Sequence, residues 1–175
     1  NDISKDNPRV ALDLLRQWQC DGVDQNRERI RWITGHALRT LVKKGEPEAL
    51  ELLGYASEPV ITVRKVVVTP GVIAMGGEVT LSFEIVSQSP EPQRLMIDYV
   101  VHHVRANSRR TAKVFKLAKR TLEPGGILII SKRHSFAPVT TRRYYPGEHT
   151  IEPKINGKVY SAAHFVLGEE IATNP

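Results

Sequence analysis

Residues 78–85 have the sequence EVTLSFEI, and this stretch decides the fold class. Four apolar residues, Val79, Leu81, Phe83 and Ile85, alternate there with polar ones. A period of two is typical of a β-strand that buries one face and turns the other toward water.

Further β-rich runs around this stretch predict an all-β unit from about residue 58 onward. They lie at residues 60–68, 95–104, 113–122, 127–133, 148–155 and 158–167. Turn signals separate them, and Asn156-Gly157 between the last two runs is a strong hairpin signal. About seven strands in roughly 110 residues, with no helical pattern among them, predict an immunoglobulin-like antiparallel β-sandwich.

The first third of the chain has the period of helices instead. Asn7 and Pro8 suit the cap and first position of a helix. Its expected apolar face carries Val10, Ala11, Leu14, Leu15 and Trp18, which places Trp18 in the core. A second helix is expected over about residues 26–44, with Gly45 in the left-handed position beyond it, and a third from Pro47 to Gly54.

Short helices joined by tight turns suit helical-repeat packing, in which each repeat needs neighbours. The sequence therefore predicts an α+β, two-domain protein. A short helical segment occupies residues 1–57, and the sandwich occupies residues 58–175. Because the chain begins at Asn1 without a Met, and already in a helical pattern, we expect it to be the C-terminal part of a longer protein.

Composition narrows the class of protein. The chain is 41% hydrophobic and 25% charged, which is typical of a globular protein. It contains no apolar run near the roughly 20 residues that span a bilayer, and no signal-peptide pattern. Cys20 is its only cysteine, so internal disulfides and Cys metal clusters are excluded. We expect a cytoplasmic protein without a membrane partner.

The net charge of +6 is concentrated in the second domain. Residues 1–57 hold nine Lys and Arg against nine Asp and Glu, whereas residues 102–144 hold eleven against the single acid Glu123. Such a concentration favours a polyanionic partner. The alternative is a solvated basic face with no partner.

Cations and hydroxyls near expected loop tips and strand ends are candidates for binding DNA phosphates. They are Lys5, Arg39, Lys43, Arg105, Arg109, Arg110, Lys113, Lys132, Arg133, His134, Thr140, Thr141, Arg142 and Arg143. In the helical part, Arg31, Arg39 and Lys43 share one helix face, which either meets phosphates or is simply the wet side. No recognition helix or zinc finger accompanies them, so the pattern favours contacts to the backbone over base reading.

Two adjacent tyrosines, Tyr144 and Tyr145, have two interpretations. Either ring can stack on an unpaired base. A tyrosine at a strand corner, whose hydroxyl caps nearby backbone, is the structural alternative and the favoured one. The scattered histidines show no metal-site spacing, and we interpret them as structural or phosphate-contacting.

Motifs of common catalytic sites are absent from the sequence, including GxSxG, P-loop, HExxH and Rossmann fingerprints. Asp2 and, second, Asp6 are the carboxylates considered for catalysis. A carboxylate can stabilise the oxocarbenium-like state formed when a glycosidic bond breaks. The alternative is that both acids cap a helix N-terminus.

Several strings resemble a known family. NDISKDNP (1–8) and WITGHALRTLVKKGEPEALELLGY (32–55) are similar to the last helical repeats of the AlkC family of DNA alkylation repair glycosylases. IDYVVHHVRANSRRTAKVFKL (97–117) and KRHSFAPVTTRRYYPGEHTIEPKING (132–157) are similar to that family's C-terminal immunoglobulin-like domain.

The resemblance implies that residues 1–57 are the end of a HEAT-like repeat domain and that the sandwich helps to hold duplex DNA. It implies removal of 3-methyladenine by hydrolysis of the N-glycosidic bond, without metal or cofactor. Asp2 is the position matched to a catalytic carboxylate, and Gly35 stands where the family pattern leads us to expect a basic residue. With the other catalytic carboxylates expected upstream, this chain alone should be inactive.

The expected partner is double-stranded DNA with alkylated bases, bound by a monomer. Two alternatives remain at this stage: a DNA-binding relative without catalysis, and an immunoglobulin-like module that binds proteins.

Overall fold

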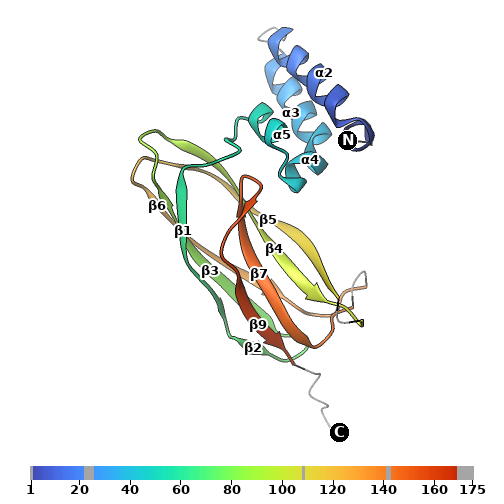
Figure 1. Cartoon of the computed structure of the whole chain (residues 1–175), viewed down its shortest axis with the longest axis vertical. Helices are drawn as coiled ribbons and strands as arrows, with labels where there is room; N and C mark the ends of the chain where they lie inside the picture. Colours follow the sequence, from blue (N-terminus) through green and yellow to red (C-terminus); the bar gives the residue numbers. More distant parts are fainter. Residues whose placement is uncertain (1, 22–25, 108, 141–142, 169–175) are drawn as a thin grey trace.

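A group of short helices precedes two packed β-sheets in the computed structural model, which describes residues 2–21, 26–107, 109–140 and 143–168 (Figure 1). The helices are α1 (Asp2–Asp6), α2 (Pro8–Asp21), α3 (Arg27–Ala37), α4 (Arg39–Lys44) and α5 (Pro47–Leu52). The strands are β1 (Ile61–Thr69), β2 (Val72–Ile73), β3 (Glu78–Ser87), β4 (Gln93–Val104), β5 (Arg110–Leu122), β6 (Ile127–Ser135), β7 (Gly147–Ile155), β8 (Lys158–Val159) and β9 (Ala163–Leu167). Among the described helices, none combines the length and apolar character needed to cross a membrane.

The strands form the predicted antiparallel sandwich. One sheet has the order β1-β3-β6, and the other has the order β2-β9-β7-β4-β5 with β8 paired to β7. All seven predicted strands are confirmed. The last predicted run, residues 158–167, is two strands, β8 and β9, and the short β2 pairs parallel to β9 where no strand was predicted.

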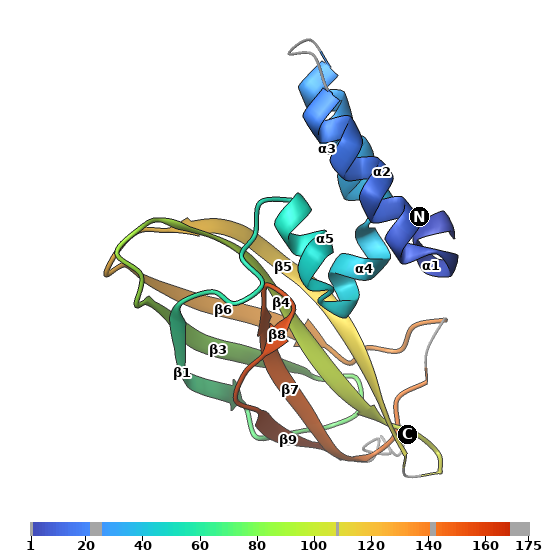
Figure 2. The ribbon, with the colours of Figure 1, turned by 45° about the horizontal axis from the view of Figure 1, so that its top comes forward.

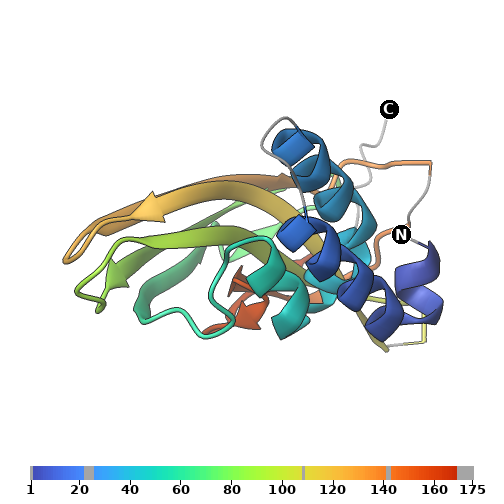
Figure 3. The same cartoon turned by 90° about the horizontal axis from the view of Figure 1, so that it is seen from above.

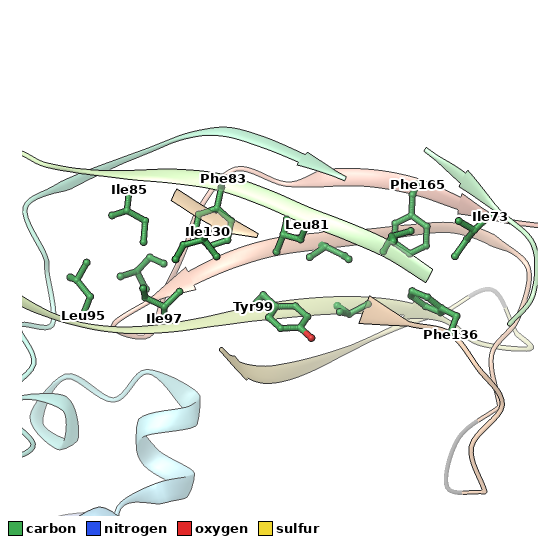
Figure 4. Close-up of a cluster of buried hydrophobic side chains, with 14 of the residues drawn as sticks. Ile73, Leu81, Phe83, Ile85, Leu95, Ile97, Tyr99, Ile130, Phe136 and Phe165 are labelled. Carbon is green, nitrogen blue, oxygen red and sulfur yellow. The ribbon is translucent and has the colours of Figure 1, made fainter. Parts of the chain in front are cut away.

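Alternation along β3 builds the sandwich core. Leu81, Phe83 and Ile85 are at most 1% exposed and face residues of β4 such as Leu95 and Ile97 (Figure 4). Burial of each such side chain contributes about 1.5–3 kcal/mol. The sequence period therefore determines both the strand and the side of it that packs inward.

The helical part has its own smaller core. Leu38 separates α3 from α4 with φ −88° and ψ 3°, so the prediction of one helix over residues 26–44 is wrong. This turn allows Leu38, Leu41 and Val42 to enter the same buried cluster. Gly45 ends α4 at φ 88°, as predicted.

The buried face of α2 differs from the predicted one. Ala11, Leu12 and Leu15 are buried, whereas Val10 is 61% and Trp18 is 42% exposed. Leu12 shifts the packed face around the helix, away from the stripe that contains Val10 and Trp18. The prediction that Trp18 lies in the core is therefore wrong.

The helices sit over the outer face of the larger sheet and leave the β5–β6 hairpin uncovered (Figure 3). The β7–β8 hairpin points toward α4 and α5 from below (Figure 2). Its tip, Asn156-Gly157, has φ 45° and 84°, as the predicted tight hairpin requires. We call the contact of this tip with the helices the joint.

Asn156 is 1% exposed and uses its whole amide at the joint. Its Oδ1 accepts a hydrogen bond from the Met96 backbone N–H (2.7 Å). Its Nδ2 donates to the carbonyls of Ala56 (2.9 Å) and Arg94 (3.2 Å). The side chain thus ties the hairpin to β4 and to the segment that follows α5.

Two further contacts close the joint. The backbones of Gly45 and Gly157 touch so closely that a Cβ on Gly157 would lie 2.5 Å from the Gly45 Cα. Lys154 of β7, which is 7% exposed, donates from Nζ to the Lys43 carbonyl at the end of α4 (2.8 Å). Met96 of β4 packs into the helical core, so the helices and the sheet share buried surface.

Candidate nucleic-acid interface

A groove of about 1010 Å³ lies between the helices and the outer face of β4 and β5. Eight cationic residues line it: Lys5, Arg27, Arg31, Arg39, Lys43, Arg94, Lys116 and Lys119. Only two acids, Glu51 and Asp98, are part of the same described lining. The groove is therefore strongly positive and suited to a polyanion.

One wall of the groove is a row of residues four apart in the sequence. Arg27, Arg31 and Gly35 follow each other on α3, and Arg39 and Lys43 continue the row on α4. Residues four apart lie on one helix face. Arg31 lies on α3 whereas Arg39 and Lys43 lie on α4, so the three do not share the face of one helix as predicted, although all three line the groove.

Gly35 interrupts this basic row. A Cβ added there would meet no atom within 4 Å, so the space beside the backbone is open. A side chain could therefore begin there without its Cβ displacing a neighbour.

The opposite wall depends on a β-bulge in β5. Asp98 pairs with Lys116 and Met96 pairs with Lys119, because the register shifts between Ile97 and Asp98. Without that extra residue, Lys116 and Lys119 would point to opposite faces of the strand. The bulge turns both ammonium groups toward the helices.

A carboxylate and an ammonium group are buried next to this wall. Asp98 is 5% exposed, and burial raises the pKa of its carboxyl despite the opposing charges of nearby lysines. Burial likewise lowers the pKa of the Lys154 ammonium group, against the charge of Asp98. The two charges partly compensate each other, so the field in the groove comes mainly from its cationic rim.

A second basic concavity, which we call the hollow, has a volume of about 550 Å³ and lies where β4 turns into β5. Arg105, Lys113 and Arg143 line it together with Tyr145. Three other predicted DNA-binding residues, Lys5, Arg39 and Lys43, line the groove instead.

The remaining predicted residues line neither site. The Arg110 guanidinium donates hydrogen bonds to the Glu148 carboxylate (2.8 Å) and the Thr150 hydroxyl (3.3 Å). Arg133 lies 4.0 Å from Glu78. The exposed residues Arg109, Lys132 and Thr140 are part of neither lining, whereas Thr141 and Arg142 lie outside the described residues.

His134 is a correction to the predicted phosphate contacts. It is 7% exposed, and its Nδ1 lies 3.0 Å from the Tyr99 hydroxyl inside the aromatic end of the core. It follows Lys132 and Arg133 in sequence, but alternation along β6 turns it inward, where it cannot reach a phosphate.

Asp2 lies at the exposed start of α1. Its carboxylate pairs with Lys5 (3.0 Å), and this hydrogen bond lowers the pKa of Asp2. Lys5 lines the groove, whereas Asp2 does not. Among the described residues, no group of three His, Cys, Asp or Glu side chains is placed to hold a metal ion.

Sequence reasoning missed four of the groove cations: Arg27, Arg94, Lys116 and Lys119. Arg27 could have been found, because it continues the spacing of four that begins with Arg31. Lys116 and Lys119 carried no such signal, since a spacing of three on a regular strand predicts opposite faces.

The sandwich domain matches a known protein family. Residues 62–169 match the family described as "Uncharacterised protein YhaZ, C-terminal Ig-like domain", and the chain belongs to this family. Its sandwich is also similar to part of a β-glucosidase from Listeria innocua (TM-score 0.51, 14% identity, 63% of this chain and 16% of that one), which shows the fold alone.

Two relatives cover the helices as well. The chain is 34% identical to YhaZ of Bacillus subtilis over 165 residues, which is 94% of this chain and 44% of that protein. It is 36% identical to the Pseudomonas fluorescens alkylpurine DNA glycosylase AlkC, solved bound to DNA containing an abasic site analog. That match has a TM-score of 0.87 and covers 95% of this chain and 45% of that one. The chain is thus of the AlkC/YhaZ type and spans less than half the length of both relatives.

Proposed function

We propose that this chain is the DNA-holding part of a DNA alkylation repair glycosylase, and that duplex DNA lies in the groove. The observation that carries the proposal is the convergence of eight cations from helices and sheet on one concave surface. The similarity to an alkylpurine DNA glycosylase solved with DNA supports the choice of duplex DNA over another polyanion.

The groove suits contacts to the phosphate backbone. Ammonium and guanidinium groups pair with phosphates whatever the base sequence, and release counterions as they do so. Each phosphate neutralised adds about −0.9 to the slope of log affinity against log salt concentration. We therefore expect steep salt dependence and little sequence preference.

The proposed reaction is hydrolysis of the N-glycosidic bond of N3-alkylated purines such as 3-methyladenine. The bond between sugar C1′ and the purine breaks, the cationic base departs as a neutral molecule, and water adds at C1′ with loss of a proton. Because the lesion already carries a positive charge, a carboxylate that stabilises the developing sugar cation is the main requirement.

Asp2 is the candidate for that carboxylate in this chain, with Asp6 second. An aspartate is ionised at neutral pH, as the role requires, and its pairing with Lys5 favours the same charged form. Its exposure at the start of α1 means that further groups would have to surround the lesion. We place those groups in the upstream half that the longer relatives have, and we propose no cofactor.

Duplex binding by the chain tests the DNA-holding role. We expect Lys119→Glu to lower duplex affinity about tenfold and to reduce the magnitude of the salt slope by about one. Arg120→Glu is the matched control, because Arg120 is the next residue on β5 and lies outside the groove lining. Equal losses for the two variants, or affinity independent of salt, would contradict the proposal and favour a protein partner.

Base release tests the catalytic part. A protein that joins this chain to the upstream half should release 3-methyladenine from methylated DNA, and Asp2→Asn should slow release while leaving duplex affinity within about twofold. Duplex binding without any base release would identify a non-catalytic DNA-binding relative instead.

A further inference from the structure

The hollow is a second basic site that shares no lining residue with the groove. Its cations come from three separate segments: Arg105 follows β4, Lys113 lies on β5, and Arg143 precedes β7. Its described lining contains no Asp or Glu, unlike that of the groove. Three positive charges around one concavity attract an anion.

The structure separates the two adjacent tyrosines. The centroid of the Tyr144 ring lies 5.1 Å from that of Phe136 and 5.6 Å from that of His103, at the aromatic end of the core. Tyr145 instead lines the hollow, half-buried, with the Arg143 guanidinium carbon 5.5 Å from its ring centroid. Tyr144 therefore has a packing role, whereas Tyr145 presents an aromatic ring beside the cations.

Tyr145 is anchored from behind by a buried histidine. His149 is 0% exposed and its Nε2 lies 3.0 Å from the Tyr145 carbonyl oxygen. Because a carbonyl only accepts, Nε2 carries the proton and donates it. The His149 ring also stacks on Phe165 at 5.5 Å, so the backbone of Tyr145 is tied to the core. Such anchoring reduces the ordering that a ligand would otherwise have to impose.

The size and chemistry of the hollow identify the ligand class. Its volume is within the range of about 300–1,000 Å³ typical of small-ligand sites. An aromatic ring flanked by cations is the arrangement that stacks an unpaired base and binds the phosphates beside it. A paired base is enclosed within the duplex and cannot enter such a hollow.

We propose that the hollow binds an unpaired nucleotide of single-stranded DNA, with the base stacked on Tyr145 and the adjacent phosphates bound by Arg105 and Arg143. The groove then binds the duplex, and the hollow binds a strand that has left it. This inference goes beyond the proposed glycosylase function and does not depend on it.

The decisive experiment measures binding after removing the bases from the DNA ligand and, separately, the aromatic ring from Tyr145. Affinities are measured by fluorescence anisotropy for a labelled thymidylate hexamer and for a hexamer of the same length with tetrahydrofuran in place of every base. We expect the unmodified chain to prefer the thymidylate hexamer by about tenfold, because stacking on an aromatic ring stabilises each base. Tyr145→Ala should abolish that preference, whereas Tyr145→Phe should keep it, since stacking needs the ring and not the hydroxyl. A preference that persists in Tyr145→Ala would overturn the proposal.

The phosphate part of the site has its own test. Arg105→Gln and Arg143→Gln should each lower the affinity for both hexamers about fivefold. Arg109→Gln is the matched control, because Arg109 is exposed near the same tip but does not line the hollow. Melting temperatures identify variants that do not fold. Since Arg105 and Arg143 are exposed, their variants decide the matter even where Tyr145→Ala unfolds; equal effects of Arg105→Gln and Arg109→Gln would overturn the proposal.

Groove variants separate this inference from the proposed function. Lys119→Glu should weaken duplex binding and leave hexamer affinity within about twofold. Loss of duplex binding in Lys119→Glu, together with no base preference in any hexamer measurement, would refute the nucleotide site in the hollow and support the duplex site in the groove. Unchanged duplex binding in Lys119→Glu, together with a preference for the thymidylate hexamer, would refute the duplex site in the groove and support the nucleotide site in the hollow.

Discussion

The groove and the hollow are both basic and concave, yet they are built in different ways. The groove has one wall from the helices and one from the sheet, and the joint at Asn156-Gly157 ties these two parts together. The hollow takes all of its described lining from the sandwich and is anchored by the aromatic core through His149.

Surface charge and site geometry therefore have separate origins in this molecule. Exposed cations supply the charge at both sites, but buried and largely uncharged contacts hold them in place. Substitutions at those buried contacts should therefore affect one site and spare the other.

The largest expected effect comes from Gly157→Ala, which should weaken duplex binding in the groove and spare the hollow. Its Cβ would lie 2.5 Å from the Gly45 Cα, at a φ of +84° that side chains rarely adopt. We expect a loss of about 2–4 kcal/mol in unfolding free energy or a displaced joint, and a fall of at least about tenfold in duplex affinity. Denaturant titration and duplex anisotropy measure the two effects.

Gly76→Ala is the matched control for that prediction. Gly76 has nearly the same φ, +86°, but a Cβ there would meet nothing within 4 Å. It should cost only about 1 kcal/mol of backbone strain and leave duplex affinity unchanged. Equal effects of the two substitutions would show that strain, and not the joint, is responsible.

The second largest expected effect is a loss of folding stability on acidification. It comes from His149, the buried residue that anchors Tyr145 beside the hollow. Burial lowers the pKa of His149 below its ordinary value of 6.5. The unfolded chain therefore binds a proton below pH 6.5 that the folded chain does not, and stability present above that pH is lost as the pH falls, by at most about 1.4 kcal/mol per unit for one proton.

Urea titrations between pH 7.5 and 5.5 measure this loss, and His149→Phe should flatten the pH dependence by up to one proton. An unchanged slope in the variant would mean that His149 is not the group responsible.

Gly35→Lys should strengthen duplex binding in the groove and leave the hollow unchanged. The new side chain completes the basic row in open space, and removal of a helical glycine adds about 0.5–1 kcal/mol of stability. Duplex affinity should rise about two- to fivefold. Gly35→Ala gives the helix effect without the charge, so duplex affinity no higher with lysine than with alanine would place this face outside the DNA contact.

The smallest effect is expected at Arg133, which lines neither site and lies 4.0 Å from Glu78. Exposed pairs of this kind contribute about 0–1 kcal/mol. Arg133→Gln should change duplex and hexamer affinities less than about twofold. A larger change in either affinity would show that the outer face of β6 also contacts DNA.

Local patterns were sufficient to predict most of the strands of this fold. The alternation in β3 and the Asn156-Gly157 turn both depend on residues close in sequence, and both were predicted correctly. The shift of the buried face of α2 depends on which neighbours surround Leu12, so the position of Trp18 could not be read from the period alone.

The sites were predicted less completely, because they depend on contacts between distant segments. Lys43 and Lys154 are 111 residues apart in sequence, yet their contact helps to close the joint beneath the groove. The bulge that aligns Lys116 with Lys119 has no local signature. The error at His134 was of a different kind, since the alternation along β6 already indicated that a neighbour of Arg133 points inward.

The buried hairpin tip also limits how this protein can be altered in length. Exposed turns normally tolerate inserted residues, and the one at Gly125, between β5 and β6, is such a turn. The tip at Asn156-Gly157 is also a short turn, but an inserted residue there would push the helices off the sheet. Tags or fused domains therefore belong at Gly125, whereas the β7–β8 turn should keep a fixed length wherever the two parts stay together.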